Sequence, residues 1–196
     1  MTLFAGTPAA QGFADGVGSL ARFNSPTNIV VDWTGTFALI VSLHIFSVPG
    51  IFFHMVCFHE QVDQLNHAIR YAVLSSATIT TLAGNGASGS ADGVGSSATF
   101  YWPWGVALDR TGSYAAIVSA CASDLTSLIC IAPYLSQADS TNQLIRKIVV
   151  SSRVVTTIAG QAGTSGRADG VGTNAVFNRP TGITVDGSFT FALVVS

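Results

Sequence analysis

The chain carries three copies of one sequence pattern, and this repetition constrains its fold more than any other feature. Each copy contains ADGVG and, further on, an apolar run that ends in aspartate: NIVVD, GVALD or GITVD. The aspartates of the three ADGVG sequences, Asp15, Asp92 and Asp169, are 77 residues apart in both intervals. A fixed period of this kind indicates that each copy forms one supersecondary unit and that neighbouring units stack.

Each complete copy contains four segments that are typical of short strands. The run that ends in aspartate follows Pro26, Pro103 or Pro180, and a turn containing glycine leads to TFALI, SYAAI or TFALV. AIRYAVL and LIRKIVV alternate with a period of two, and ATITTLAG and RVVTTIAG are rich in Thr, Val and Ile. The 20 glycines and the low share of charged residues, 9%, fit many short strands joined by tight turns. The sequence therefore predicts an all-β fold of four-stranded antiparallel blades, as in a β-propeller.

The motifs of the copies also resemble a known family. The order N-x-x-I-R, then T-(L/I)-A-G, then G-x-x-D-G-x-G-x-x-A-x-F-x-x-P-x-G-I-x-V-D is similar to the NHL-repeat family of propellers. The resemblance covers nearly all of the chain except two segments, and one departure is Asn28, which replaces the glycine found at Gly105 and Gly182. The resemblance implies a propeller blade that serves as a binding platform, and it implies no particular reaction.

The number of copies predicts an incomplete propeller. The chain, residues 1–196, contains the end of one outer strand, two whole blades and the first half of another. Because a propeller closes with roughly four to eight blades, we expect a sheet array that is not closed and that is a fragment of a longer chain. The remaining blades of that longer chain are then the first expected partners.

Two segments, 41–61 and 118–137, have no counterpart in the repeat and interrupt it at the same place. Both begin with Val-Ser and end in Gln, and the third copy also ends with Val-Ser there. Without them, the joins FALI–VDQLNHAIR and YAAI–ADSTNQLIR match position by position. A eukaryotic splice donor translates in frame as Val-Ser, and a pyrimidine-rich tract ending in CAG translates as Phe-, Leu- and Ser-rich sequence ending in Gln. We therefore expect both insertions to be translated introns of a eukaryotic gene.

The first insertion also overlaps the least polar part of the chain. Residues 37–58 carry no charge and are long enough for a helix that spans a membrane. However, Pro49–Gly50 lies at the middle, and no Lys or Arg occurs between Arg22 and Arg70 to orient a span. We favour the intron hypothesis, and a membrane anchor is the alternative.

Residue types that bind metals gather in the same insertion, but their intervals are irregular and no partner cluster lies at zinc spacing. Three cysteines are an odd number, and irregular spacing argues against a disulfide framework. The sequence therefore predicts no metal site and no cofactor. The metal-binding types in the first insertion are His44, His54, Cys57, His59 and Glu60, and the other two cysteines are Cys121 and Cys130.

Two repeated features have both a chemical and a structural interpretation. GNGASG, residues 84–89, matches the dinucleotide-binding pattern G-x-G-x-x-G, but the sequence after it predicts a turn and a strand instead of a helix. The aspartate of ADGVG supplies one carboxylate per loop, whereas Ca²⁺ takes six or more oxygen ligands. We expect loop glycines, and turn-capping aspartates both in ADGVG and at the strand ends, Asp32, Asp109 and Asp186.

Residues that break the repeat are better candidates for a site, because a site needs each role filled once. Asn28 stands where its counterparts are glycine, and Trp102 and Trp104 replace small or polar residues. If the strand after the proline lines the propeller channel, these three side chains lie near its mouth and form a candidate ligand contact. The alternative, which we favour for the tryptophans, is packing between blades.

The sequence therefore predicts a non-catalytic binding or scaffold module that contacts a protein or another macromolecule through its loops. The alternative is a fragment of a metal-dependent enzyme, because propellers similar to these include lactonases and lyases that hold a metal at the channel through single carboxylate, histidine or asparagine ligands. On the inner strands only Asn28 fits that description. No basic stripe supports a nucleic-acid surface.

Overall fold

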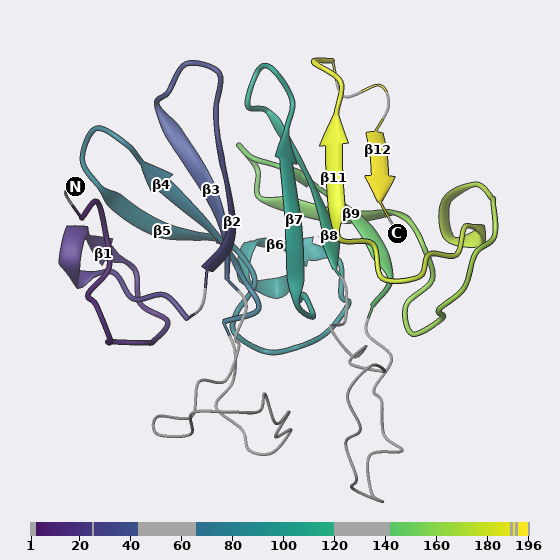
Figure 1. Cartoon of the computed structure of the whole chain (residues 1–196), viewed down its shortest axis with the longest axis horizontal. Helices are drawn as coiled ribbons and strands as arrows, with labels where there is room; N and C mark the ends of the chain where they lie inside the picture. Colours follow the sequence, from purple (N-terminus) through teal and green to yellow (C-terminus); the bar gives the residue numbers. More distant parts are fainter. Residues whose placement is uncertain are drawn as a thin grey trace, which may run out of the picture.

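The computed structural model describes residues 3–24, 26–42, 66–119, 142–188, 190 and 192–195, which form two antiparallel blades and part of a third (Figure 1). Blade 1 contains β2 (Pro26–Val31), β3 (Phe37–Ser42), β4 (Ile69–Val73) and β5 (Thr78–Ala83). Blade 2 contains β7 (Pro103–Leu108), β8 (Tyr114–Ser119), β9 (Leu144–Val149) and β10 (Val154–Ala159). Blade 3 contains β11 (Gly182–Val185) and β12 (Ala192–Val195). The predicted fold class, an all-β partial propeller that is not closed, is confirmed.

The ADGVG sequences form more than the turn that the sequence predicts. In the first two copies, β1 (Gly16–Val17) and β6 (Gly93–Val94) add a short fifth strand to the outer edge of the blade that follows. β1 pairs with β5 through Gly16 opposite Ile79 and Val17 opposite Thr78. A 3₁₀ turn follows in each copy: η1 (Gly18–Leu20), η2 (Gly95–Ser97) and η3 (Gly172–Asn174). The short strand satisfies backbone groups that would otherwise be free at the edge of β5 and β10.

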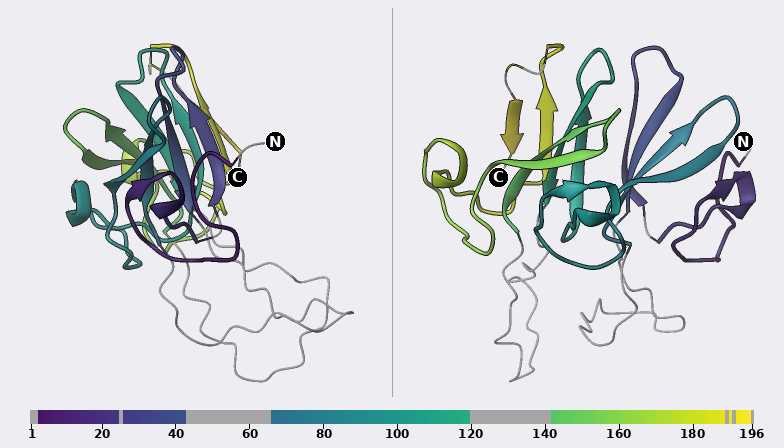
Figure 2. Two further views of the ribbon diagram at one scale, coloured as in Figure 1. Left: turned by 90° about the vertical axis from the view of Figure 1, so that its left-hand side faces the viewer. Right: turned by 180° about the vertical axis from the view of Figure 1, so that it is seen from behind.

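The blades spread like a fan from their inner strands (Figures 1 and 2). β2, β7 and β11 lie next to one another at the centre, and each is the strand that begins at or after the repeated proline. The chain then runs outward through each blade, in the order β2-β3-β4-β5 and β7-β8-β9-β10. The strand after the proline is therefore the innermost strand of its blade.

The main hydrophobic core lies between blades 1 and 2. One side of it comes from blade 1 and the other from blade 2. The segment that joins the blades, linker 2 (residues 84–102), contributes two side chains to it. Burial of these side chains contributes about 25 cal/mol for each Å² of apolar surface that leaves water. The fully buried members are Leu39, Val41, Ile69 and Ala83 of blade 1, Ala98 and Phe100 of linker 2, and Ala115, Ile117 and Ile148 of blade 2.

The repeated glycine at the start of each linker is required by backbone geometry. Gly84 has φ +96°, and a Cβ atom there would come within 2.5 Å of the carbonyl oxygen of His67. Gly160 has φ +98°, and its Cβ would meet the carbonyl oxygen of Gln143 at 2.3 Å. A loop follows Gly84 and leads to β6, so GNGASG is a loop in which glycine permits the backbone turn.

Most of both insertions lies outside the described residues, but the strands on either side of each insertion pair with each other. Val41 at the end of β3 is opposite Ile69 of β4, and Ser119 of β8 is opposite Leu144 of β9. Val41–Ser42 and Val118–Ser119, which begin the insertions in the sequence, continue β3 and β8. The blades are therefore intact around both insertion points.

Residues 37–42 of the apolar stretch 37–58 form strand β3, and residues 43–58 lie outside the described residues. β3 pairs on one side with β2 and on the other with β4. Among the residues that the structure describes, no helix has the length and apolar character needed to cross a membrane.

A buried arginine ties each linker to the blade that follows it. Arg70 of β4 has no exposed surface and donates hydrogen bonds to the carbonyl oxygens of Arg22 and Ala14, at 3.0 and 2.7 Å. It also pairs with the Asp15 carboxylate at 2.7 Å. The backbone N–H and hydroxyl of Thr81 on β5 donate to the same carboxylate. Arg70 thus joins linker 1 (residues 3–24) to both outer strands of blade 1.

The second copy repeats this network. Arg146 of β9 is fully buried, donates to the carbonyl oxygens of Thr99 and Ala91, and pairs with Asp92 at 2.8 Å. Thr157 donates to the Asp92 carboxylate as Thr81 does to Asp15. Desolvation lowers the pKa of both arginine side chains, and the neighbouring aspartates partly offset it. Asp15 and Asp92 therefore have a structural role, but each holds a buried arginine across its blade instead of capping its own turn.

We expect Asp92→Ala to lower the free energy of unfolding by about 2 kcal/mol, because it leaves the buried Arg146 guanidinium without its carboxylate. Asp169→Ala is the matched control. Asp169 occupies the same position in the third copy but is exposed and has no arginine partner within the described part of the chain. Urea denaturation followed by tryptophan fluorescence measures both. Equal effects of the two substitutions would contradict the assigned role.

Deletion of residues 41–61 and 118–137 together is expected to leave both blades folded. After the first deletion Val62 takes the place of Val41 opposite Ile69, so the strand keeps the same residue at that position. Each shorter connection lowers the entropic cost of loop closure by about 1 kcal/mol, so the unfolding midpoint should rise. Circular dichroism against temperature checks this, and loss of the β spectrum would show that the insertions belong to the blades.

Candidate functional site

The turns that end the inner strands are fixed by the repeated strand-end aspartates. Asp32 accepts hydrogen bonds at 2.7 Å from the backbone N–H groups of Thr36 and Phe37, and others from the backbone and hydroxyl of Thr34. Desolvation raises the pKa of Asp32, but these hydrogen bonds outweigh it and hold the pKa well below its usual range. Asp186 caps its turn in the same manner, through Ser188 and Thr190. The turn-capping role predicted for the strand-end aspartates is confirmed.

The residue directly after each of these aspartates differs from copy to copy, and the three lie close together. They are Trp33, Arg110 and Gly187. The Arg110 guanidinium lies over the Trp33 ring, 5.2 Å from its centroid. The Arg110 backbone N–H donates to the Gly187 carbonyl oxygen at 3.2 Å. A chain of contacts therefore links the turns of blades 1, 2 and 3 at one end of the inner strands.

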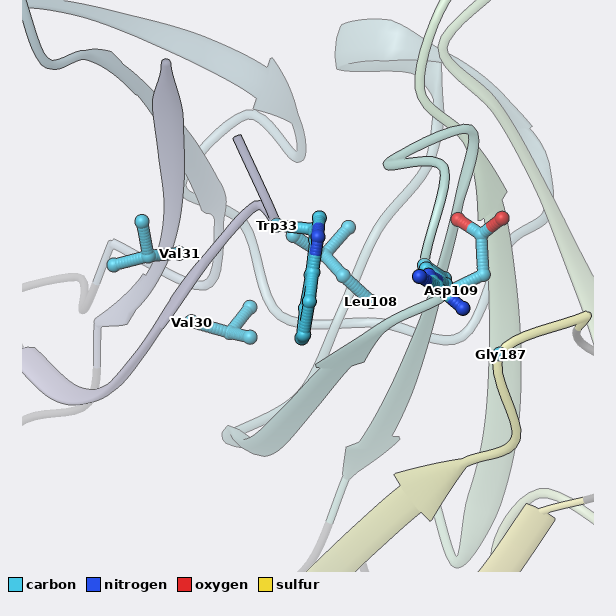
Figure 3. Close-up of a pocket in the computed structure, with 7 residues that line it drawn as sticks. Val30, Val31, Trp33, Leu108, Asp109 and Gly187 are labelled. Carbon is cyan, nitrogen blue, oxygen red and sulfur yellow. The ribbon is translucent and has the colours of Figure 1, made fainter. Parts of the chain in front are cut away.

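These residues line a pocket of about 360 Å³ between the blades. In Figure 3 the Trp33 ring stands between Val30 and Val31 of β2 on one side and Leu108 and Asp109 on the other. Trp33 is 76% exposed, so a large aromatic side chain faces solvent. Within the part of the chain that the structure describes, the Arg110 guanidinium has no carboxylate partner. The pocket thus combines an exposed aromatic face, the Arg110 guanidinium and apolar walls with the Asp109 carboxylate, which accepts a hydrogen bond from Thr111 of its own turn.

Trp33 and Arg110 were not among the residues that the sequence analysis selected. The signal was present, because the residue after the strand-end aspartate is Trp, Arg and Gly in the three copies. This is the same kind of break in the repeat that singled out Asn28. What the sequence could not supply was the stacking of the three turns, which brings these positions together.

The structure places Asn28, Trp102 and Trp104 away from this pocket. Asn28 is exposed in the first half of β2, opposite Val41, where the register with β3 is irregular. Trp104 is half-buried in the first half of β7. None of the three lines the pocket, which lies at the other end of the inner strands. Their contact with a ligand stays a prediction.

Trp102 takes part in a contact between blades. Its φ is +47°, and its backbone N–H donates to Nδ1 of His67, which lies two residues before β4 of blade 1, at 3.2 Å. The Trp102 ring stacks on Tyr101, which stacks on His67, with 5.4 Å between centroids in both pairs. In the next blade the Arg179 N–H donates to Oε1 of Gln143 at 2.5 Å. These contacts support the packing alternative for Trp102.

The remaining candidate chemistry has no cluster in the described part of the chain. There, no group of three or more His, Cys, Asp or Glu lies close enough to hold a metal ion. The residues His44, His54, Cys57, His59 and Glu60, and the cysteines Cys121 and Cys130, lie outside the described residues.

The comparisons with known proteins show similarity in fold. No family model matches the sequence, and no curated protein matches it. Among solved structures, an auxiliary nutrient binding protein from Bacteroides ovatus superposes with a TM-score of 0.56 and 17% identity, over 91% of this chain and 36% of that one. A protein of unknown function from Bacteroides thetaiotaomicron gives 0.51 and 18%, over 84% and 43%. The chain therefore spans less than half of either protein. Both neighbours are bacterial, so the eukaryotic origin stays a prediction.

His67 gives a measurable pH dependence. Burial lowers its pKa from 6.5 to about 4, and its Nδ1 must be unprotonated to accept the Trp102 N–H. Because the unfolded chain binds the proton more tightly, stability should fall as the pH drops from 6.5 towards 4. The loss should be on the order of 2 kcal/mol.

His67→Gln is the test variant, because Gln143 makes the equivalent hydrogen bond in the next blade. The variant should keep the contact and lose this part of the pH dependence. Urea denaturation of both proteins at several pH values between 4 and 7 gives the comparison. Parallel curves for wild type and variant would show that His67 does not titrate as assigned.

Proposed function

We propose that this chain is a non-catalytic binding module of NHL type, whose ligand occupies the pocket beside Trp33 and Arg110. The observation that carries the proposal is the departure from the repeat at that position. The aspartates that cap the three turns are the same in every copy, whereas the residue that follows each of them is not. A residue needed only for the blade would recur, so Trp33 and Arg110 serve a role that is filled once.

The chemistry of the pocket favours a peptide segment that has an acidic side chain next to an apolar one. The Arg110 guanidinium offers N–H donors in the planar arrangement that matches a carboxylate. The Trp33 ring, with Val30 and Leu108 beside it, offers apolar surface to the neighbouring side chain. Tryptophan and arginine are also the residue types that most often dominate binding energy at protein interfaces.

The fold neighbours are compatible with a binding role. The Bacteroides ovatus structure is described as a nutrient binding protein, and the likeness to it extends over nearly the whole of this chain. At 17% identity the likeness supports the fold and leaves the ligand open. The peptide class proposed here therefore rests on the pocket alone.

Peptide binding tests the proposal. Fluorescein-labelled octapeptides containing Glu-Phe or Asp-Leu should bind the full chain, and the same peptides with Gln or Asn in place of the acid should bind at least tenfold more weakly. Arg110→Ala and Trp33→Ala should each weaken binding by a similar factor, because each removes one half of the site. Fluorescence anisotropy gives the dissociation constants.

Arg167→Ala is the control, because it removes an equal charge from an exposed position that does not line the pocket. Binding that does not distinguish acid from amide, or that Arg110→Ala leaves unchanged, would contradict the proposal. A stoichiometric metal ion that binds the chain and is lost with Asn28→Gly would instead favour the enzyme alternative.

A further inference from the structure

Blade 1 exposes an apolar surface that is buried at the same position of blade 2. Cross-strand pairing puts Ile29 opposite Ile40, and Ile40 opposite Arg70, so the three side chains share one face of blade 1. We call it the leading face. Ile29 is 59% exposed there, whereas its counterpart Val106 in blade 2 is 6% exposed. The difference arises because blade 1 covers the leading face of blade 2.

Blade 3 exposes the opposite face. Leu39 of blade 1 lies on the face that packs against blade 2, the trailing face, and it is fully buried. Its counterpart in blade 3 is Leu193, which pairs with Thr184 of β11 and is 66% exposed. Leu39 and Val106 belong to the same core between blades 1 and 2. The molecule therefore presents, at its two ends, the two halves of an interface that it already contains.

The leading face of blade 1 already carries the kind of linker that is found between two packed blades. Linker 1 lies against it as linker 2 lies between blades 1 and 2, with Ala21 and Phe23 in the positions of Ala98 and Phe100. Arg70 already holds linker 1 in place. What the leading face lacks, by comparison with blade 2, is the trailing face of another blade.

We propose that a second copy of this chain supplies it, with the trailing face of blade 3 in one copy docked on the leading face of blade 1 in the next. The contact is head to tail, so it leaves one unpaired face at each end of any open assembly and continues into rings or filaments. The complementarity is the one that blades 1 and 2 demonstrate within the chain. An exposed apolar surface of this kind is a site of association in water.

Sedimentation velocity of the full chain over a range of concentrations tests for this assembly. The wild type should form a concentration-dependent series of oligomers. Ile29→Asp and Leu193→Asp should each raise the dissociation constant at least tenfold, because each places a charge in the apolar contact. Val94→Asp is the control: Val94 is 56% exposed although its blade has a neighbour, so its exposure does not mark an interface.

Mixing the two variants separates head-to-tail contact from other association. Ile29→Asp keeps an intact trailing face and Leu193→Asp an intact leading face, so an equimolar mixture should form a one-to-one heterodimer and nothing larger. A wild type that is monomeric at all concentrations overturns the proposal and favours the other occupant of these faces, the remaining blades of a longer chain. A mixture that stays monomeric, or an assembly that either single substitution leaves unchanged, also overturns the proposal.

Two precautions keep the result interpretable. Circular dichroism confirms that each variant retains the β spectrum, and Ile29→Thr with Leu193→Thr, which preserve strand propensity, replace any aspartate variant that does not. Neither position lines the pocket, so peptide binding should persist in these variants. The proposed function and this assembly can therefore fail independently.

Discussion

The buried arginine of each complete blade, Arg70 or Arg146, is the interaction on which the rest of the structure depends. Its guanidinium donates hydrogen bonds to two carbonyl oxygens and one carboxylate of the preceding linker. The linker contains only a two-residue strand and one 3₁₀ turn, and the guanidinium supplies three of the hydrogen bonds that attach it to the blade. With the linker fixed, Ala98 and Phe100 enter the core between the blades, and the next inner strand begins in the correct place. A cation that lies fully buried is held by these partners together.

The candidate pocket follows from the same stacking of blades. Trp33 and Arg110 come from turns that a strand-end aspartate fixes within each blade, and the packing of β2 against β7 brings the turns together. The contact between Arg110 and Gly187 extends the arrangement to blade 3. A binding site that forms at a blade boundary in this way requires no additional loop. It needs only different residues at one repeated position.

The repeat predicts most of the fold and little of the site. The four strands of each blade and the turn-capping role of Asp32 follow from local patterns of apolar, glycine and aspartate residues. The pairing of Asp15 with Arg70 could not be predicted from local patterns, because 55 residues separate the two. Both residues recur in the next copy, but nothing in the sequence indicates that they are in contact. The same holds for Trp33 and Arg110. Each directly follows a strand-end aspartate, and the two side chains come into contact only because the blades pack against each other.

Native-state hydrogen exchange tests most directly whether each linker and its blade form one cooperative unit. In the wild type, the Thr99 amide of linker 2, which donates to Ala91, should exchange with the same free energy as the amides of β9. Arg146→Met should remove the protection of Thr99 while β9 stays protected. The account is contradicted if Thr99 exchanges rapidly in the wild type, or if its protection survives the loss of Arg146.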